Sequence, residues 1–325
     1  MQTLFDQVFA NGVLLVMWGA LLFHLILPIP HAAHPTTLWH KFAELLASKV
    51  NNNNNNNNNN NHNYSQSLIS GTLAWGLMVL PTLVILLALQ PLVWQSQLFE
   101  LALLLLAIDW RNNEKLANQL IKVLGREDKA AARQLLAPIV NRQTESLSSL
   151  GLGKAATETI IMGYARNVVC VLFWYAIGGG IAALMYRLVV ELARAWSPSR
   201  KQFSPFGSTA IKIVAILELI PMRLFALMIV FGDKATHTFK MMLVQSRSWP
   251  LPGPAWLITA VGNKLELSLG GPAIYDNTKA IRAKLGGRIA PSALHLSQVQ
   301  KLLFGRIAIW IFLQSLALLF IHQGI

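Results

Sequence analysis

Six apolar runs alternate with polar stretches along the chain, and they predict membrane-spanning helices. The predicted spans cover about 10–28, 68–90, 95–110, 168–190, 209–231 and 305–322. A helix rises 1.5 Å per residue, so about 20 apolar residues cross the ~30 Å hydrocarbon core of a bilayer. The third run is short and crosses only if Leu92, Trp94 and Trp110 extend it. The pattern therefore predicts an all-α fold, a multispan helical membrane protein in which residues 1–325 form a single integral membrane domain.

Two long stretches between the spans are too polar for lipid. They are residues 111–166 and 232–304, and the first carries leucines at helical spacing. Within it, Gly125 is placed to end one helix and Asp128 to cap the next. We therefore expect two polar helical segments in the cytoplasm. Lys and Arg are enriched in them, so the positive-inside rule predicts that both termini lie in the periplasm.

The loop after the first span contains an amphipathic segment followed by a low-complexity tract. Leu38, Phe42, Leu45 and Leu46 recur at helical spacing, as in a helix that lies at the membrane interface. Residues 51–63 are almost entirely Asn and have no apolar face to bury. We predict that this tract is a disordered Asn-rich loop.

Three histidines in the same loop raise the possibility of a metal site. His31, His34 and His40 lie close together in the sequence, but no Cys or carboxylate joins them at ligand spacing. Interfacial or anion-contacting histidines are the alternative, and we predict no metal site there.

Composition supports the membrane assignment and limits the partners. The chain is 54% hydrophobic and 13% charged, with a net charge of +13. Because the sequence contains no nucleic-acid-binding motif, we attribute the positive charge to loops that face anionic lipid and expect membrane lipid, not nucleic acid, as a partner. Cys170 is the only cysteine and lies inside a span, so it is expected to pack as a small apolar side chain.

The fifth span contains two opposite charges that cannot pair with each other. Glu218 and Arg223 are five residues apart, which places them on different faces of a helix. Charges inside a span are costly unless they are paired. We therefore expect at least one of them to have a partner on another element.

Several short motifs occur in a fixed order along residues 28–280. They are His34-Pro35, AARQLLAPIVNRQT at 131–144, ATET with Glu158, LFW at 172–174, Gly178-Gly179, Tyr186, IPMRL at 220–224, SWP at 248–250 and LGGPAIY at 269–275. Their order and spacing resemble those of the CbiB/CobD family of cobalamin-biosynthesis membrane proteins.

The resemblance implies a function and a site. It implies a multi-pass protein of the bacterial inner membrane that forms an amide bond between adenosylcobyric acid and an aminopropanol phosphate, with ATP and Mg²⁺ as cofactors and a corrinoid or other phosphate-bearing molecule as partner. It implies Glu158 as the catalytic residue. The substrate-binding residues that it implies are His34, Arg133, Arg142, Thr144, Arg223, Gly270, Gly271, Pro272 and Tyr275.

The sequence departs from the family pattern mainly at acidic positions. The family's E-N-x-x-D-G is replaced by residues 162–167, and its N-T-L-D-S-M by residues 190–195. The Asp of G-R-D-T is Gln143, and a pair of Asp positions before I-P-x-R-L is Val214 and Ala215.

Three functions remain open at this point. The first is the amide-forming synthase. The second is a non-catalytic membrane sensor or accessory protein similar to AmpE, in which acids around the LFW block are also lost. The third is a transporter, although no inverted repeat is visible between the two halves of the sequence.

Overall fold

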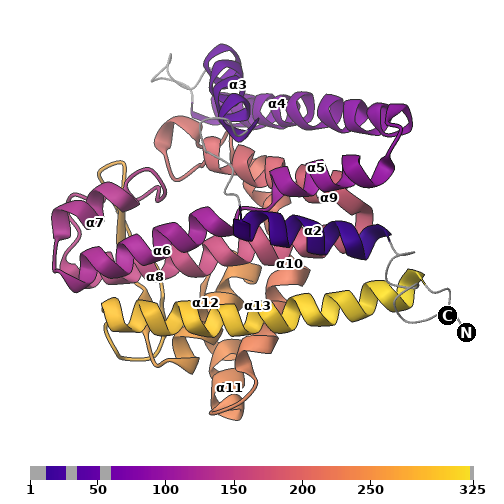
Figure 1. Ribbon diagram of the computed structural model, residues 1–325. Helices are drawn as coiled ribbons and strands as arrows, with labels where there is room; N and C mark the ends of the chain where they lie inside the picture. Colours follow the sequence, from indigo (N-terminus) through magenta and orange to yellow (C-terminus); the bar gives the residue numbers. More distant parts are fainter. Residues whose placement is uncertain (1–11, 27–34, 52–59, 323–325) are drawn as a thin grey trace, which may run out of the picture.

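The computed structural model describes residues 12–26, 35–51 and 60–322 and is mostly helical (Figure 1). The helices are α2 (Gly12–Ile26), α3 (Pro35–Val50), α4 (Asn60–Leu89), α5 (Ser96–Ala107), α6 (Trp110–Gly125), α7 (Lys129–Leu136), α8 (Ser149–Tyr164), α9 (Cys170–Ala195), α10 (Ser208–Val230), α11 (Ala235–Gln245), α12 (Pro252–Lys264) and α13 (Ala293–His322). The predicted end of one polar helix at Gly125 and the cap at Asp128 are confirmed. The Asp128 carboxylate accepts a hydrogen bond from the Ala131 N–H over 3.0 Å.

Four helical stretches are long and apolar enough to cross a membrane. They cover Tyr64–Leu92, Ser149–Ala195, Ser208–Val230 and Ala293–Phe320, and a shorter apolar helix covers Gly12–His24. Four of the six predicted spans overlap the long stretches, and α2 corresponds to a fifth. The sixth corresponds to α5, which has 12 residues.

Helix α8 runs into α9 without leaving the helical path. A π-helical turn, η4 (Ala165–Val169), joins them, so one helix replaces the predicted boundary between a polar segment and a span at residue 168. Charged side chains on both sides of this junction are paired inside the protein. Glu158 is 9% exposed and Glu218 of α10, the partner of Arg166, is 1% exposed.

Helix α9 is interrupted in its middle. Gly178 and Gly179 leave the helical conformation, and Gly179 has φ of 65°, which favours glycine. The Gly180 N–H, at the start of the second half, donates a hydrogen bond to the Glu100 carboxylate of α5. A carboxylate on α5 therefore caps a half-helix of α9 inside the apolar region.

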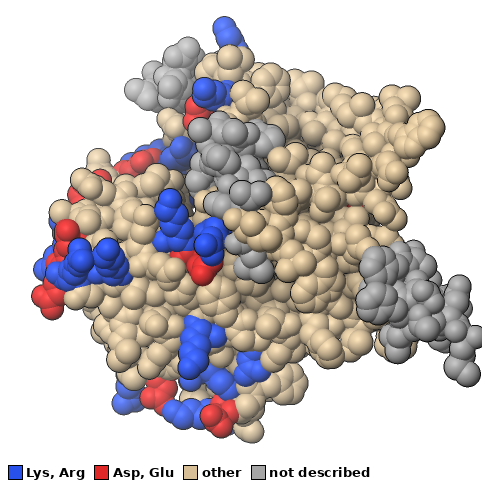
Figure 2. All heavy atoms as spheres, in the orientation of Figure 1, with Lys and Arg blue, Asp and Glu red and all other residues tan. Residues whose placement is uncertain are grey.

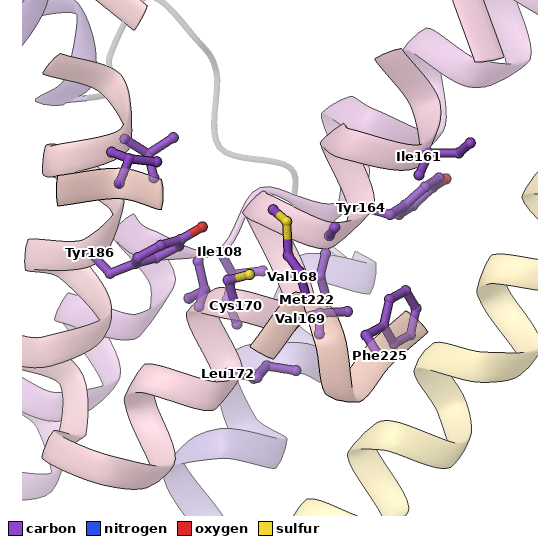
Figure 3. Close-up of a cluster of buried hydrophobic side chains, with 14 of the residues drawn as sticks. Ile108, Ile161, Tyr164, Val168, Val169, Cys170, Leu172, Tyr186, Met222 and Phe225 are labelled. Atoms are coloured by element: carbon purple, nitrogen blue, oxygen red, sulfur yellow. The ribbon is translucent and has the colours of Figure 1, made fainter. Parts of the chain in front are cut away.

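Buried residues surround the junction of α8 and α9. Figure 3 shows Tyr164, Val168 and Cys170 from this junction beside Met222 and Phe225 of α10, and all five are buried. Cys170 is a free thiol in this cluster, as predicted for an apolar packing residue. This packing fixes the helices that carry the polar residues described below.

Helix α4 faces outward along much of its length. Ile69, Leu73, Leu77 and Leu80 are each more than half exposed. In the view of Figure 2 the surface over α4 and α5 consists of uncharged residues, whereas Lys, Arg, Asp and Glu gather at the opposite end near α6 and α7 and below near α11. An apolar surface of this kind is suited to lipid.

Helix α3 is the amphipathic helix predicted from the sequence. Leu38, Phe42 and Leu45 are exposed, while Ala43 and Ala47 are buried. Its Trp39 indole donates to the Leu188 carbonyl of α9 over 3.0 Å. Helix α4 begins at Asn60, so the last residues of the predicted disordered loop 51–63 are helical, and residues 52–59 lie outside the described part.

The segment before α13 corrects the all-α prediction. It forms four short strands: β1 (Ser268–Gly270), β2 (Ala273–Tyr275), β3 (Thr278–Ala280) and β4 (Lys284–Gly286). Strand β1 pairs antiparallel with β4, and β2 pairs antiparallel with β3. Glycines and residues with positive φ permit these turns, and a search for hydrophobic periodicity does not detect strands of three residues.

Candidate functional site

A single buried carboxylate joins three distant parts of the chain. Glu158 of α8 accepts a hydrogen bond from Arg142 Nη2 over 3.1 Å and another from the Gly270 N–H over 2.8 Å. Arg282 Nη2 lies 3.6 Å from the same carboxylate. The predicted catalytic residue therefore lies where the loop before α8 meets the β segment.

The glycine turn between β1 and β2 brings the backbone close to Glu158. Gly270 and Gly271 have φ of 66° and 91°. A Cβ at Gly270 would overlap the Ala283 carbonyl oxygen. These positions need glycine, which adopts positive φ at no steric cost. The turn thus directs an N–H group toward the Glu158 carboxylate.

Four cations lie around this acid and the adjoining glycine turn. They are Arg142, Lys154, Arg282 and Lys284, and Lys154 lies one helical turn before Glu158. Lys154 Nζ lies 3.5 Å from the Gly270 carbonyl oxygen, and Arg282 Nε donates to the Gly271 carbonyl over 3.1 Å. The Arg282 guanidinium also stacks on Trp249 at 5.1 Å. We call this group, with Glu158 and Gly270-Gly271, the Glu158 cluster.

Burial lowers the pKa of Arg142, and the Glu158 carboxylate opposes that shift. The Arg142 side chain is 7% exposed. A buried guanidinium without its carboxylate would be very unfavourable. The pair therefore depends on both partners.

The loop that carries Arg142 is fixed to the β segment by its next residue. The Gln143 N–H donates to the Ile274 carbonyl over 2.9 Å, and its side-chain amide donates to Asn277 over 2.6 Å. Thr144 is 2% exposed in the same loop. Tyr275, at the end of β2, lies close enough to Arg142 to affect its pKa, and Pro272 is exposed at the turn.

The remaining predicted site residues lie elsewhere. Arg133 donates to the Leu147 carbonyl over 2.9 Å and so holds the loop between α7 and α8. Arg223 stacks on Trp256 of α12 at 4.9 Å and, among the described residues, has no recorded contact with the Glu158 cluster. His34 falls outside the described residues.

The sequence analysis missed Lys154, Arg282 and Lys284. Lys154 could have been found because it precedes Glu158 by four residues in one helix, so both occupy the same face. Arg282 and Lys284 carried no local signal, because the pairing of β1 with β4, which places Lys284 opposite Gly270, brings this segment to the glycine turn.

A second polar region lies farther along the same helix. A cavity of about 210 Å³ is lined by Arg166, Arg194, Glu218, Asn141 and Ser197, together with apolar residues. Arg166 holds Glu218 with two hydrogen bonds, and the expectation that an intramembrane charge pairs across elements is confirmed. Eight residues separate Arg166 from Glu158, about 12 Å along the helix.

The departures from the family pattern gather around this cavity. Arg166, Ala193, Val214 and Ala215 occupy positions where the family motifs have Asp, and all four line it. Val190, at the Asn of the second motif, lines it as well. Substitutions that are up to 49 residues apart in the sequence thus change a single region in space.

The donor set does not fit the Mg²⁺ ion implied by the family. Within residues 12–26, 35–51 and 60–322 no group of three or more His, Cys, Asp or Glu side chains could hold a metal ion. Glu158 and Glu218 are each held by an arginine. Mg²⁺ usually binds through one or two free carboxylates together with substrate phosphates, and arginine occupies both of these carboxylates.

These features define a class of protein: a helical protein with helices able to cross a membrane and a cationic cluster around one carboxylate at a glycine turn. A model of the CobD/CbiB protein family matches residues 17–303, and the chain belongs to this family. The resemblance drawn from the sequence motifs is confirmed.

Curated relatives agree with the family assignment. The cobalamin biosynthesis protein CobD of Stutzerimonas stutzeri (strain A1501) is 30% identical over 300 residues, which cover 92% of this chain and 96% of the relative. That of Chromobacterium violaceum is 27% identical and covers 73% of this chain and 72% of the relative. That of Listeria monocytogenes serotype 4b is 29% identical over 63% and 68%. No solved structure matches the chain.

Proposed function

We propose that this protein is an adenosylcobinamide-phosphate synthase, which joins the carboxyl group of adenosylcobyric acid to the amine of an aminopropanol phosphate. The observation that carries the proposal is the Glu158 cluster, in which four cations face a glycine turn. Arg and Lys bind phosphate oxygens, and backbone can approach a phosphate closely only at glycine. The cluster therefore suits a reaction whose partners carry phosphate.

The reaction requires an activated carboxyl group. Transfer of the γ-phosphoryl group of ATP to the carboxylate gives an acyl phosphate and ADP. The amine then attacks the acyl carbon, the C–N bond forms, the C–O bond to phosphate breaks and phosphate leaves. Lys154, Arg282 and Lys284 are suited to bind the phosphate charge, because their side chains gather at one turn.

Glu158 has two roles in this proposal. Held by Arg142, it keeps the glycine turn in place through the Gly270 N–H, and it accepts the proton that the amine loses on attack. No step uses a metal held by protein carboxylates, because the described donor set does not fit one. Arg142 acts through Glu158 and is a positioning residue.

We further propose six spans in a bacterial inner membrane, formed by α2, α4, α5, α9, α10 and α13, with both termini in the periplasm. Four long apolar stretches and the uncharged surface over α4 and α5 in Figure 2 support it. Reporter fusions after Asn63, Gln143 and Lys284 should report cytoplasm, and a fusion at Ile325 should report periplasm. A cytoplasmic signal at Ile325 would contradict the arrangement.

Complementation tests the function. The wild-type chain should restore growth on cobyric acid to a strain that lacks its synthase. Glu158→Gln should not restore it, since the amide accepts no proton and loses the charge that pairs with Arg142. Lys279→Gln removes a charge from an exposed residue of the neighbouring strand β3 and should behave like wild type. Membrane levels should be equal in all three.

The AmpE-like accessory protein is the second candidate, and the loss of acids around the cavity favours it. If the wild-type chain accumulates in the membrane and does not complement, the synthase proposal fails and this candidate replaces it.

A further inference from the structure

The one acid among the described residues that line the cavity between α9 and α10 is already paired. Glu218 accepts from Arg166 Nε over 2.6 Å, from Arg166 Nη2 over 3.1 Å and from the Tyr186 hydroxyl over 3.4 Å. Glu191, behind the wall, contacts Arg187, His40 and Arg194. Arginine therefore neutralises both carboxylates, which leaves little negative charge for a divalent cation.

The cations of the same cavity are more accessible. The side chain of Arg194 is 39% exposed and that of Arg166 is 26% exposed, against 1% for Glu218. Among the described residues, the hydrogen bonds of the Arg194 side chain use only Nη1, which donates to Glu191. Its other guanidinium nitrogens can therefore donate to a ligand.

Neutral groups complete the lining. Asn141 donates to the Ser197 hydroxyl over 3.0 Å at the edge of the cavity. Val190, Ala193, Val214 and Ala215 supply apolar wall where carboxylates would repel an anion. An apolar wall strengthens the attraction between a guanidinium and an oxyanion, because it lowers the local dielectric constant.

We propose that this cavity binds a phosphate group directly through Arg194 and without a divalent cation. Arg166 and Glu218 form its fixed wall, and about 210 Å³ is room for a small phosphate ester or for the phosphate end of a larger molecule. The inference rests on the proposed function for the origin of the phosphate, which is a substrate. It predicts a second anion site, whose wall residue Arg166 lies about 12 Å from Glu158 along the helical path.

A thiol placed at the edge of the cavity tests the proposal without turnover. Cys170 is fully buried and is the only native cysteine, so Asn141→Cys gives one accessible thiol in the full-length protein. The measurement is the rate at which a charged thiol reagent labels the detergent-purified variant in EDTA. Inorganic phosphate at about ten times its dissociation constant should slow labelling about tenfold by simple occupancy.

Variants that each remove one positive charge identify the residue that binds phosphate. Arg194→Gln should abolish protection by phosphate, while Lys201→Gln, which removes an exposed charge from the following loop, should keep it. Lys284→Gln in the Glu158 cluster should also keep it. Absence of protection in EDTA, or protection that persists in Arg194→Gln, overturns the proposal. Protection lost in Lys284→Gln alone assigns the phosphate to the Glu158 cluster, which overturns the inference and leaves the proposed function standing.

Adding acids to the cavity wall should make phosphate binding depend on Mg²⁺. Val214→Asp together with Ala215→Asp places two carboxylates in the wall, so phosphate should protect this variant only when Mg²⁺ is present. Protection of that variant in EDTA equal to that of its parent would contradict the proposal.

Discussion

Arg166 donates two hydrogen bonds to Glu218, Nε to Oε1 over 2.6 Å and Nη2 to Oε2 over 3.1 Å, and so joins the turn between α8 and α9 to the middle of α10. Glu218 is 1% exposed. Arginine suits such a pair because its planar fork matches a carboxylate. The pair therefore fixes the register of two helices and supports one wall of the cavity.

Removing one partner of this pair should cost far more than removing both. Arg166→Leu leaves the Glu218 charge buried and unpaired, a loss of about 3–5 kcal/mol, whereas Arg166→Leu with Glu218→Leu replaces the pair with apolar contacts. Thermal unfolding of the purified protein in detergent should give a much lower Tm for the single variant than for the double. Equal losses in the two variants would show that the ion pair is not what holds the helices.

Gly71 of α4 is predicted to be intolerant of any side chain. A Cβ there would overlap the Phe206 carbonyl oxygen, so Gly71→Ala must push α4 away from the loop before α10. In the same helix, Gly76→Ala would meet only a Leu80 methyl group at 3.9 Å. We expect Gly71→Ala to lower the Tm and Gly76→Ala to leave it unchanged or raise it, because alanine favours helix.

Gly179→Ala should destabilise the interrupted helix. The position has φ of 65°, and a Cβ would lie 2.7 Å from a Glu100 carboxylate oxygen. Gly305→Ala in α13 is the matched control, since its Cβ would meet no described atom within 4 Å beyond the neighbouring backbone of its own helix. Membrane accumulation and Tm should fall for the first variant and stay at the wild-type level for the second. A wild-type Tm for Gly179→Ala would mean that α9 tolerates a continuous helix.

Gly270→Ala should remove activity without unfolding the protein. The added methyl group conflicts with the Ala283 carbonyl and displaces the N–H that Glu158 accepts, yet the turn lies outside the long apolar helices. Complementation should be lost at a normal membrane level. Gly125→Ala, whose Cβ would make an ordinary contact with Ala293 at 3.6 Å, should complement fully. Full complementation by Gly270→Ala would remove the turn from the site.

Local sequence patterns predicted the helices, some of the helix ends and the need of one buried charge for a partner. The Asp128 cap follows from residue type and position alone, and an intramembrane Glu218 implied a partner because the alternative is costly. The identity of that partner could not be predicted. Arg166 lies 52 residues away, and helical periodicity carries no information about which faces meet.

The site was predicted only in part, because local sequence patterns do not show which elements meet. The family motifs named Arg142, Glu158 and Gly270, which the fold brings together, but they also named Arg223, which stacks on Trp256. Arg282 and Lys284 reach the glycine turn through the pairing of short strands, and those strands lack a detectable alternation of apolar residues. The family motifs thus identified Arg142, Glu158 and Gly270, whereas only the three-dimensional structure identified Arg282 and Lys284.

The hydrogen bond from Gly270 to Glu158 also sets an order of events during translation. The two residues are separated by 112 positions, so Glu158 leaves the ribosome long before its partner exists. At ~5–20 residues per second the interval is about 6–22 s. Helix α8 must therefore be held during this interval by contacts made earlier, of which the bond from Arg142 is one. A nascent chain that stalls before residue 270 carries an incomplete cluster whose carboxylate lacks one of its donors.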